Sequence, residues 1–204
     1  MKLFQTIEEI VPQLDGWCSV PKAYVLASTV IAFRPKVSVE IGVFGGSSAI
    51  PIALAHKYVN YGKLIAIDPW SREAAMEGYS DEHKNWWGKQ DMEGIMGKFL
   101  KHVDELQLND FIEVRRAKSD DVEPPADTGF IHLDGQHTMQ ALRDAQRFMA
   151  NMPIGTNAAI DDVAWMGGGP AAAVKWMHDN GWKELYPLDT GAIFQRIKAP
   201  KKTT

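Results

Sequence analysis

Two short segments that lie far apart in the sequence carry side chains suited to acid–base chemistry and metal binding. The first contains Asp134 and His137, and the second contains Asp161 and Asp162. Each segment follows a short apolar run that predicts a buried strand. If these strands are parallel neighbours, their ends lie about 5 Å apart and the carboxylates face one another. Ionised carboxylates at that distance repel, so one must take up a proton unless a hard divalent cation such as Mg²⁺ lies among them.

The two histidines of the first segment have different expected roles. His137 comes three residues after Asp134, in the loop that opens the next helix, which places its imidazole near the metal. A histidine there is suited to act as general base for a hydroxyl whose pKa the metal has lowered. His132 precedes Asp134 by two residues on a buried strand, and we expect it to pack within the sheet. The alternative for the acids is that they cap turns and helices.

A zinc site is not favoured. The sequence has no H-x-x-x-H pattern, and its single cysteine, Cys18, can form neither an internal disulfide nor a cysteine-ligated metal site.

A glycine-rich loop follows the first predicted strand and has the sequence EIGVFGGSS, residues 40–48. Gly42 permits a tight turn, and Gly45 and Gly46 allow a ligand to approach the backbone. Ser47 or Ser48 is placed to cap the following helix, whose N-terminal N–H groups attract anions. The loop matches neither G-x-G-x-x-G nor G-x-x-x-x-G-K-[ST], which disfavours a dinucleotide site and a nucleoside triphosphatase. The alternative is a tight turn that binds no ligand.

Asp68 ends the second predicted strand, where a carboxylate accepts hydrogen bonds from both hydroxyls of an unphosphorylated ribose. Its alternative role is a turn or helix cap. The loop and this acid together predict an adenosine-containing cofactor. Because the dinucleotide pattern fails, we expect S-adenosylmethionine rather than NAD: a methionine carboxylate fits against helix N–H groups without the room that a pyrophosphate needs.

The elements that position these residues alternate between strands and helices. Such alternation predicts an α/β fold with a doubly wound, Rossmann-like parallel sheet. Ligands bind at the carboxyl ends of strands in such sheets, which brings Asp68, Asp134 and Asp161 to one edge. The predicted strands are Lys36–Gly42, Lys63–Asp68, Phe111–Arg115, Gly129–Asp134 and Thr156–Asp161, followed by a hairpin of Lys183–Pro187 and Ala192–Ile197; the predicted helices are Lys22–Ala32, Ser47–Tyr58, 90–107, 138–150 and 170–180.

We expect residues 1–204 to form a single domain. Residues 1–35 should form N-terminal helices in two pieces, broken around Asp15-Gly16 and Pro21. The segment 69–99 is rich in tryptophan and methionine and predicts either a lid over an acceptor site or a helix packed on the sheet edge. The glycine-containing run Asp161–Gly169 is a candidate second mobile edge.

The amino-acid composition limits the classes of protein to which this chain can belong. The chain of 204 residues is 45% hydrophobic with a formal net charge of −4, which excludes a disordered chain. It also disfavours electrostatic binding to nucleic acid. The longest apolar run is too short for a membrane span, and the acidic N-terminus does not resemble a signal peptide. We therefore expect a cytoplasmic protein, and the apolar N-terminal helices allow a homo-oligomer.

Taken together, these segments resemble the class I S-adenosylmethionine-dependent methyltransferases, over about residues 16 to 197. The likeness is greatest to the Mg²⁺-dependent macrolide-sugar O-methyltransferases, with catechol O-methyltransferase as a more distant relative. The residues that carry the resemblance are Gly16-Trp17, Val39–Ser48, Ile67–Ser71, Ile131–His137 and Ile160–Asp162.

The resemblance implies a seven-stranded methyltransferase sheet with an antiparallel C-terminal hairpin. It also implies roles for individual residues: Glu40, Gly42, Gly46 and Ser48 at the cofactor, Asp68 at its ribose, Ser119 at its adenine, Asp134, Asp161 and Asp162 as Mg²⁺ ligands, and His137 as the base. Two features depart from the family pattern. Pro153–Asn157 replaces the usual Pro-Gly-Gly turn, and Asp161 stands where a longer glutamate is common.

The expected activity is O-methylation of a hydroxyl on a small-molecule or glycan acceptor, assisted by Mg²⁺ or another hard divalent cation. A non-catalytic module that binds an adenosine cofactor, an NAD-dependent oxidoreductase and a hydrolase using the acids and the metal alone are the alternatives. Fold and cofactor do not choose among acceptors.

Overall fold

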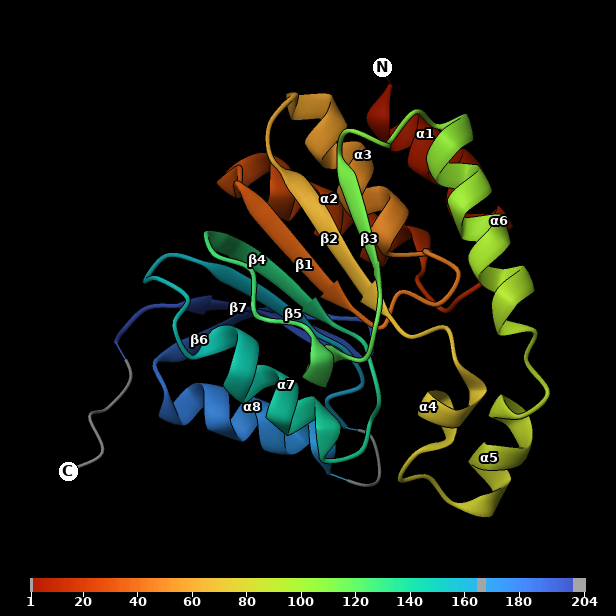
Figure 1. The fold of residues 1–204 in the computed structure, drawn as a ribbon. Helices are drawn as coiled ribbons and strands as arrows, with labels where there is room; N and C mark the ends of the chain where they lie inside the picture. Colours follow the sequence, from red (N-terminus) through yellow and green to blue (C-terminus); the bar gives the residue numbers. More distant parts are fainter. Residues whose placement is uncertain (1, 165–167, 200–204) are drawn as a thin grey trace.

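A seven-stranded sheet forms the centre of the protein in a computed structural model, which describes residues 2–164 and 168–199 (Figure 1). The strand order is β3-β2-β1-β4-β5-β7-β6, and β7 runs antiparallel to both of its neighbours. The strands are β1 (Val37–Ile41), β2 (Lys63–Asp68), β3 (Ile112–Arg116), β4 (Thr128–Leu133), β5 (Asn157–Ile160), β6 (Trp182–Leu188) and β7 (Gly191–Arg196).

Helices cover both faces of the sheet (Figure 1). One layer contains α1 (Leu3–Ile10), α2 (Val20–Phe33), α3 (Ala49–Val59) and α6 (Met92–Glu105), and the other contains α7 (Gln140–Met149) and α8 (Gly169–Asp179). Two short helices, α4 (Arg72–Met76) and α5 (Asp81–Trp87), lie beyond the carboxyl ends of β1–β3 (Figure 1). Short 3₁₀ helices occupy Val11–Gln13 and Ser119–Asp121.

The sheet is covered on both sides because its strands bury both faces. Along β2, Leu64 and Ala66 join the core under α2 and α3, whereas Ile65 and Ile67 join the core under α7 and α8. Successive side chains of a strand point to opposite faces, so an uninterrupted apolar run serves two cores. The predicted fold class and the C-terminal hairpin are confirmed, and every predicted strand is present within about one residue at each end.

The N-terminal helices form two pieces separated at residues 14–19, as expected around Asp15-Gly16. Two local expectations were wrong. Pro21 does not lie in the break but stands in the first turn of α2, where a missing N–H has no cost. Neither Ser47 nor Ser48 caps α3 through its hydroxyl; Ser48 stands at the N-cap position, but its hydroxyl donates to Glu40 instead.

The segment 69–99 was expected to be either a lid or a helix packed on the sheet edge, and its two parts differ in structure. Its first part forms α4 and α5, which the sequence analysis did not predict, and its last part opens α6, which packs on the core. The run Asp161–Gly169 lies partly outside the described residues, at 165–167. Among the described residues, no helix is long and apolar enough to cross a membrane.

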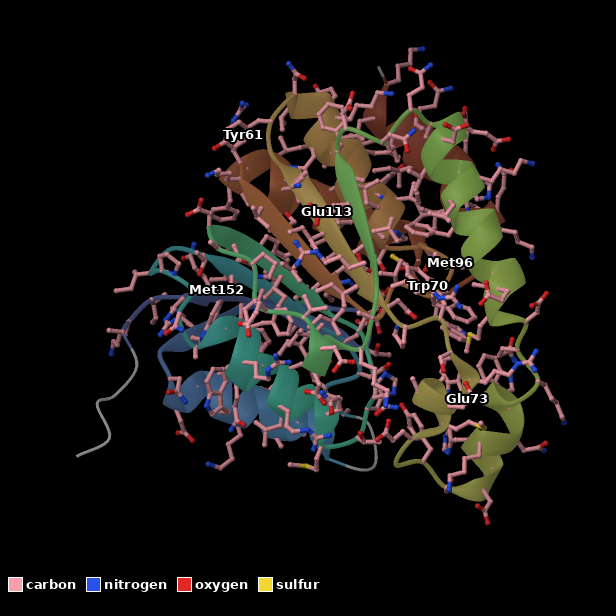
Figure 2. The ribbon with its side chains drawn as sticks, in the orientation of Figure 1. Tyr61, Trp70, Glu73, Met96, Glu113 and Met152 are labelled. Atoms are coloured by element: carbon pink, nitrogen blue, oxygen red, sulfur yellow. The ribbon has the colours of Figure 1, made fainter. Side chains whose placement is uncertain are left out.

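Phe99 connects α6 to the sheet edge and to the glycine loop. It is fully buried, and its ring stacks on Trp70 with centroids 5.8 Å apart. Figure 2 shows Trp70 and Met96 in this layer between the sheet and α6. A Cβ atom at Gly46, where φ is +84°, would lie 2.3 Å from the Phe99 ring, so the ring packs directly under the loop backbone.

We expect Phe99→Ala to lower the free energy of unfolding by about 3–5 kcal/mol, because it leaves a cavity that the surrounding core cannot fill. Urea denaturation measures this loss. Tyr58→Ala is the matched control, since Tyr58 is 53% exposed, and it should change stability by less than about 0.5 kcal/mol. Equal losses in the two variants would contradict this packing role.

Candidate active site

The candidate site lies where the carboxyl ends of β1, β4 and β5 meet. The backbone N–H of Asp134 donates to Ile41 O at 2.9 Å, and that of Asp161 donates to Leu133 O at 3.0 Å. Parallel pairing therefore fixes the two acids side by side, as expected. A cavity of about 730 Å³ opens over this edge. Of the predicted site residues, its walls include Gly42, Ser48, Asp68, Ser119, Asp134, His137, Asp161 and Asp162.

The glycine loop is shaped by Gly42, whose φ of +87° favours glycine. A Cβ atom at this position would lie 2.2 Å from the carbonyl oxygen of Asp134. A side chain at Gly42 would therefore collide with the backbone that carries the first acid. The backbone of the glycine loop therefore packs directly against the backbone of Asp134 at the end of β4.

Asp68 organises the same loop. Its Oδ2 accepts hydrogen bonds from the N–H groups of Val43 and Phe44, both at 3.0 Å, and its Oδ1 accepts from Trp70 N at 2.7 Å. Burial raises the pKa of Asp68, whereas these three hydrogen bonds oppose the shift. The carboxylate thus has the capping role that was the alternative for it, with one acceptor position left for a ligand hydroxyl.

Glu40 lies beneath the loop and does not form part of the cavity wall. It is fully buried; its Oε1 accepts from the Ser48 hydroxyl and lies 3.4 Å from Nδ1 of His132, and its Oε2 has no hydrogen-bond partner. His132 is fully buried in the sheet, as expected. Burial lowers the pKa of His132, but the nearby Glu40 carboxylate outweighs that effect and raises it.

Ser119 lies in the cavity wall just after β3. Its hydroxyl donates to Asp144 Oδ1 at 2.7 Å and accepts from Gln140 Nε2 at 3.3 Å. Gly46 lies on the Phe99 side of the loop, outside the residues that line the cavity.

The two acids at the ends of β4 and β5 have a buried cation between them, which the sequence analysis missed. The ammonium of Lys22 forms an ion pair with Asp161 Oδ2 and lies 3.5 Å from Asp134 Oδ2. Burial raises the pKa of Asp134 to about 8, with the neighbouring Asp161 carboxylate adding to the effect of burial and Lys22 opposing it. Burial also acts to raise the pKa of Asp161, but His132 and Lys22 lower it overall. The pair therefore retains one proton near neutral pH.

His137 and Asp162 form a second pair of side chains next to Asp134. Nε2 of His137 is 3.1 Å from Asp162 Oδ2, and its backbone N–H donates to the hydroxyl of Tyr79 at 2.9 Å. Burial lowers the pKa of His137, and the adjacent carboxylates only partly oppose this shift, so the imidazole is neutral at pH 7.

Potential metal ligands form two overlapping groups within the described residues. Atoms of His132, Asp134 and Asp161 lie within 4.8 Å of one another, and so do atoms of Asp134, His137 and Asp162. Asp134 belongs to both groups. The structure thus brings all three predicted acids and the predicted base to one place, with Asp134 at its centre.

Aromatic side chains from separate segments form one wall of the cavity. Trp17, before α2, stacks on Phe44 of the glycine loop with ring centroids 5.2 Å apart. Trp86 and Trp87, on α5, approach Trp17 to 5.5 and 6.3 Å. Trp17 lines the cavity and is 69% exposed, so much of its apolar ring is accessible.

The sequence contained a signal for Lys22. It is the only charged residue in α2, a helix whose other residues are mostly apolar. A buried ammonium costs several kcal/mol unless a carboxylate pairs with it, so an isolated lysine in a buried helix predicts an acidic partner. Tyr79 had no comparable signal, because its partner is a backbone N–H group.

The strand order and the site at the carboxyl ends define a class I methyltransferase fold. The family model described as a methyltransferase domain matches residues 39–163, more than half of the chain, and the protein belongs to this family. The resemblance found in the sequence is thereby confirmed. The match to a methyltransferase family argues against the alternative of an NAD-dependent oxidoreductase.

Solved structures agree on the fold. The O-methyltransferase NovP has a TM-score of 0.70 at 13% identity, covering 88% of this chain and 81% of its own. TomG from Streptomyces achromogenes, solved with SAM, has a TM-score of 0.62 at 14% identity. An O-methyltransferase from Bacillus cereus, solved with SAH, also has 0.62, at 15% identity. For both, the coverage is 97% of this chain and 91% of the other. No curated protein matches the sequence.

Removing the carboxylate of Asp68 tests its role in the loop. We expect Asp68→Ala to lower stability by about 2–4 kcal/mol, because it leaves partly buried N–H groups without an acceptor. The amides of Val43 and Phe44 should exchange with deuterium faster than in the parent protein. Asp81→Ala, at a fully exposed position, is the control, and unchanged exchange at the loop in Asp68→Ala would count against this assignment.

Proposed function

We propose that this protein is an S-adenosylmethionine-dependent O-methyltransferase that uses a divalent cation and a histidine base. The observation that carries the proposal is the convergence of Asp134, Asp161, Asp162 and His137 on the cavity that also contains the glycine loop. TomG and the Bacillus enzyme, which share the fold, are described with the methyl donor or its product. The acceptor is a hydroxyl of a small molecule or a glycan.

The cofactor end of the cavity has groups suited to an adenosine. Asp68 offers its remaining acceptor position to a ribose hydroxyl, and Ser119 lies where the adenine is expected. The N-terminus of α3 follows the loop, and Ser48 at its N-cap position lines the cavity. The positive end of the α3 dipole favours a carboxylate such as that of the methionine portion.

The acidic side of the cavity fits a hard divalent cation. Asp134, Asp161 and Asp162 would hold it, since carboxylate oxygens are the preferred ligands of Mg²⁺. Two observations support the fit: Asp161 Oδ1 is buried without a partner, and Asp134 retains a proton even beside Lys22. The site therefore has more negative charge than Lys22 balances. When bound, such a cation lowers the pKa of a nearby hydroxyl.

His137 has the protonation state and the partner that a general base needs. Its imidazole is neutral at pH 7 and accepts the proton of the acceptor hydroxyl, and Asp162 stabilises the resulting imidazolium. The freed oxygen electron pair forms the new bond to the methyl carbon, and the carbon–sulfur electrons return to sulfur. Tyr79 holds the backbone of His137, so the base stays in place. Trp17 offers an apolar face that orients an acceptor ring.

Methyl transfer from labelled S-adenosylmethionine to a panel of sugars, phenols and polyketides tests the function. We expect Asp134→Ala to abolish turnover and His137→Ala to lower kcat by about 10²–10⁴-fold. Both should still bind S-adenosylhomocysteine in calorimetry, because neither side chain holds the adenosine. His178→Ala, an exposed histidine on α8, is the control and should keep full activity.

Different results separate the alternatives. Full activity of Asp134→Ala in a chelator excludes the metal-assisted mechanism. An unchanged pH–rate profile of His137→Ala shows that His137 is not the general base. Cofactor binding with neither Mg²⁺ binding nor transfer to any acceptor indicates the non-catalytic module.

The raised pKa of Asp134 predicts a pH-dependent affinity for the metal. Because this carboxyl keeps its proton up to about pH 8, the proton must leave before the oxygen binds a cation, so affinity rises from pH 6 to pH 8. Calorimetry with Mn²⁺ at pH 7 in two buffers of different ionisation enthalpy should show release of about one proton. Asp134→Asn should lose this release, and binding without proton release in the parent protein would contradict the prediction.

A further inference from the structure

Lys22 is buried at the acidic edge of the cavity and is 3% exposed. Its ammonium uses one oxygen of each of two carboxylates, Oδ2 of Asp161 and Oδ2 of Asp134. No other lysine or arginine among the described residues pairs with these acids. The ion pairs with Asp161 and Asp134 thus offset the free-energy cost of burying the ammonium.

The backbone around Lys22 is fixed to both sides of the site. The Ser19 side chain accepts from Lys22 N at 3.2 Å and begins α2, and its hydroxyl donates to Asp189 in the turn between β6 and β7. One residue earlier, Cys18 N donates to the Ser47 hydroxyl at the start of α3. These contacts connect the segment that carries Lys22 to the glycine loop and to the β6–β7 turn. They therefore fix the position of the backbone from which the Lys22 ammonium reaches the two acids.

The two carboxylate oxygens of Asp161 have different surroundings. Lys22 occupies Oδ2 of Asp161, whereas Oδ1 of the same carboxylate is buried and has no hydrogen-bond partner. The side chain of Asp161 is 8% exposed, so an unpaired oxygen there is costly unless a ligand satisfies it. Three acidic side chains, Asp134, Asp161 and Asp162, meet at this edge, whereas Lys22 is the one ammonium that pairs with any of them among the described residues.

We propose that Lys22 is a positioning residue for the divalent cation. By holding one oxygen of Asp161 and approaching one oxygen of Asp134, it orients both carboxylates and leaves their other oxygens for the ion. This inference rests on the metal-assisted mechanism proposed above. The opposite role, in which the ammonium takes the place of the ion and competes with it, is distinguished by the direction of the effect on affinity.

Mn²⁺ binding to the purified full chain, followed by electron paramagnetic resonance at fixed pH, tests the proposal in Lys22→Met and Lys22→Arg. We expect Lys22→Met to bind Mn²⁺ about 10–100-fold more weakly, the usual loss when a partner of a metal ligand is removed. Lys22→Arg should also weaken binding at least about tenfold, because a guanidinium takes both oxygens of a carboxylate and so occupies the one left for the ion. Lys175→Met, at an 80% exposed lysine on α8, should bind as the parent does.

Calorimetry with S-adenosylhomocysteine provides a second readout, and this affinity should stay within about twofold in every variant that folds. Unchanged or tighter Mn²⁺ binding in Lys22→Met overturns the positioning role, and so does parental binding in Lys22→Arg if Lys22→Met does not fold. If the parent protein binds S-adenosylhomocysteine but no Mn²⁺, the metal-assisted mechanism fails and this inference fails with it. Parental Mn²⁺ binding that Lys22→Met retains leaves the mechanism standing and overturns the inference alone.

Discussion

The site depends on the electrostatics of two carboxylates that the sheet forces together. Asp134 and Asp161 follow adjacent parallel strands, and their backbone N–H groups are held by the neighbouring strands, so neither acid is free to move away. In a buried position their repulsion must be balanced. Lys22 supplies part of that balance and a retained proton supplies the rest. In the proposed mechanism a divalent cation would replace this proton, which links the fold of the sheet to the chemistry proposed for the site.

The same edge couples the cofactor side of the cavity to the acidic side. Gly42 lies against the carbonyl of Asp134, and Asp68 holds the loop through backbone hydrogen bonds. A change in loop shape therefore reaches the acid directly. Class I methyltransferases need a methyl donor and an acceptor in line, and this contact keeps the two halves of the site at a fixed separation.

The segment from α4 to α5 touches both halves. Tyr79 binds the backbone of His137, Gln136 donates to the carbonyl of Ala74, and the indoles of α5 meet Trp17. Lys118 and Glu77 form an ion pair 2.6 Å long at the rim of the cavity. Residues of α4 and α5 also line the cavity. That this segment moves as a lid stays a prediction.

Local sequence determined the strands, most helices and the order in which the acids follow the strands, because an uninterrupted apolar run such as KLIAID folds as a two-sided strand in any doubly wound sheet. The resemblance to methyltransferases also followed from short motifs. Only the tertiary structure decided that Lys22 pairs with Asp161, that Asp68 binds the loop backbone and that Glu40 lies beneath the cavity wall. These partners are separated by tens of residues in the chain. Their pairing depends on how helices and strands pack in three dimensions, which no local pattern of residues specifies.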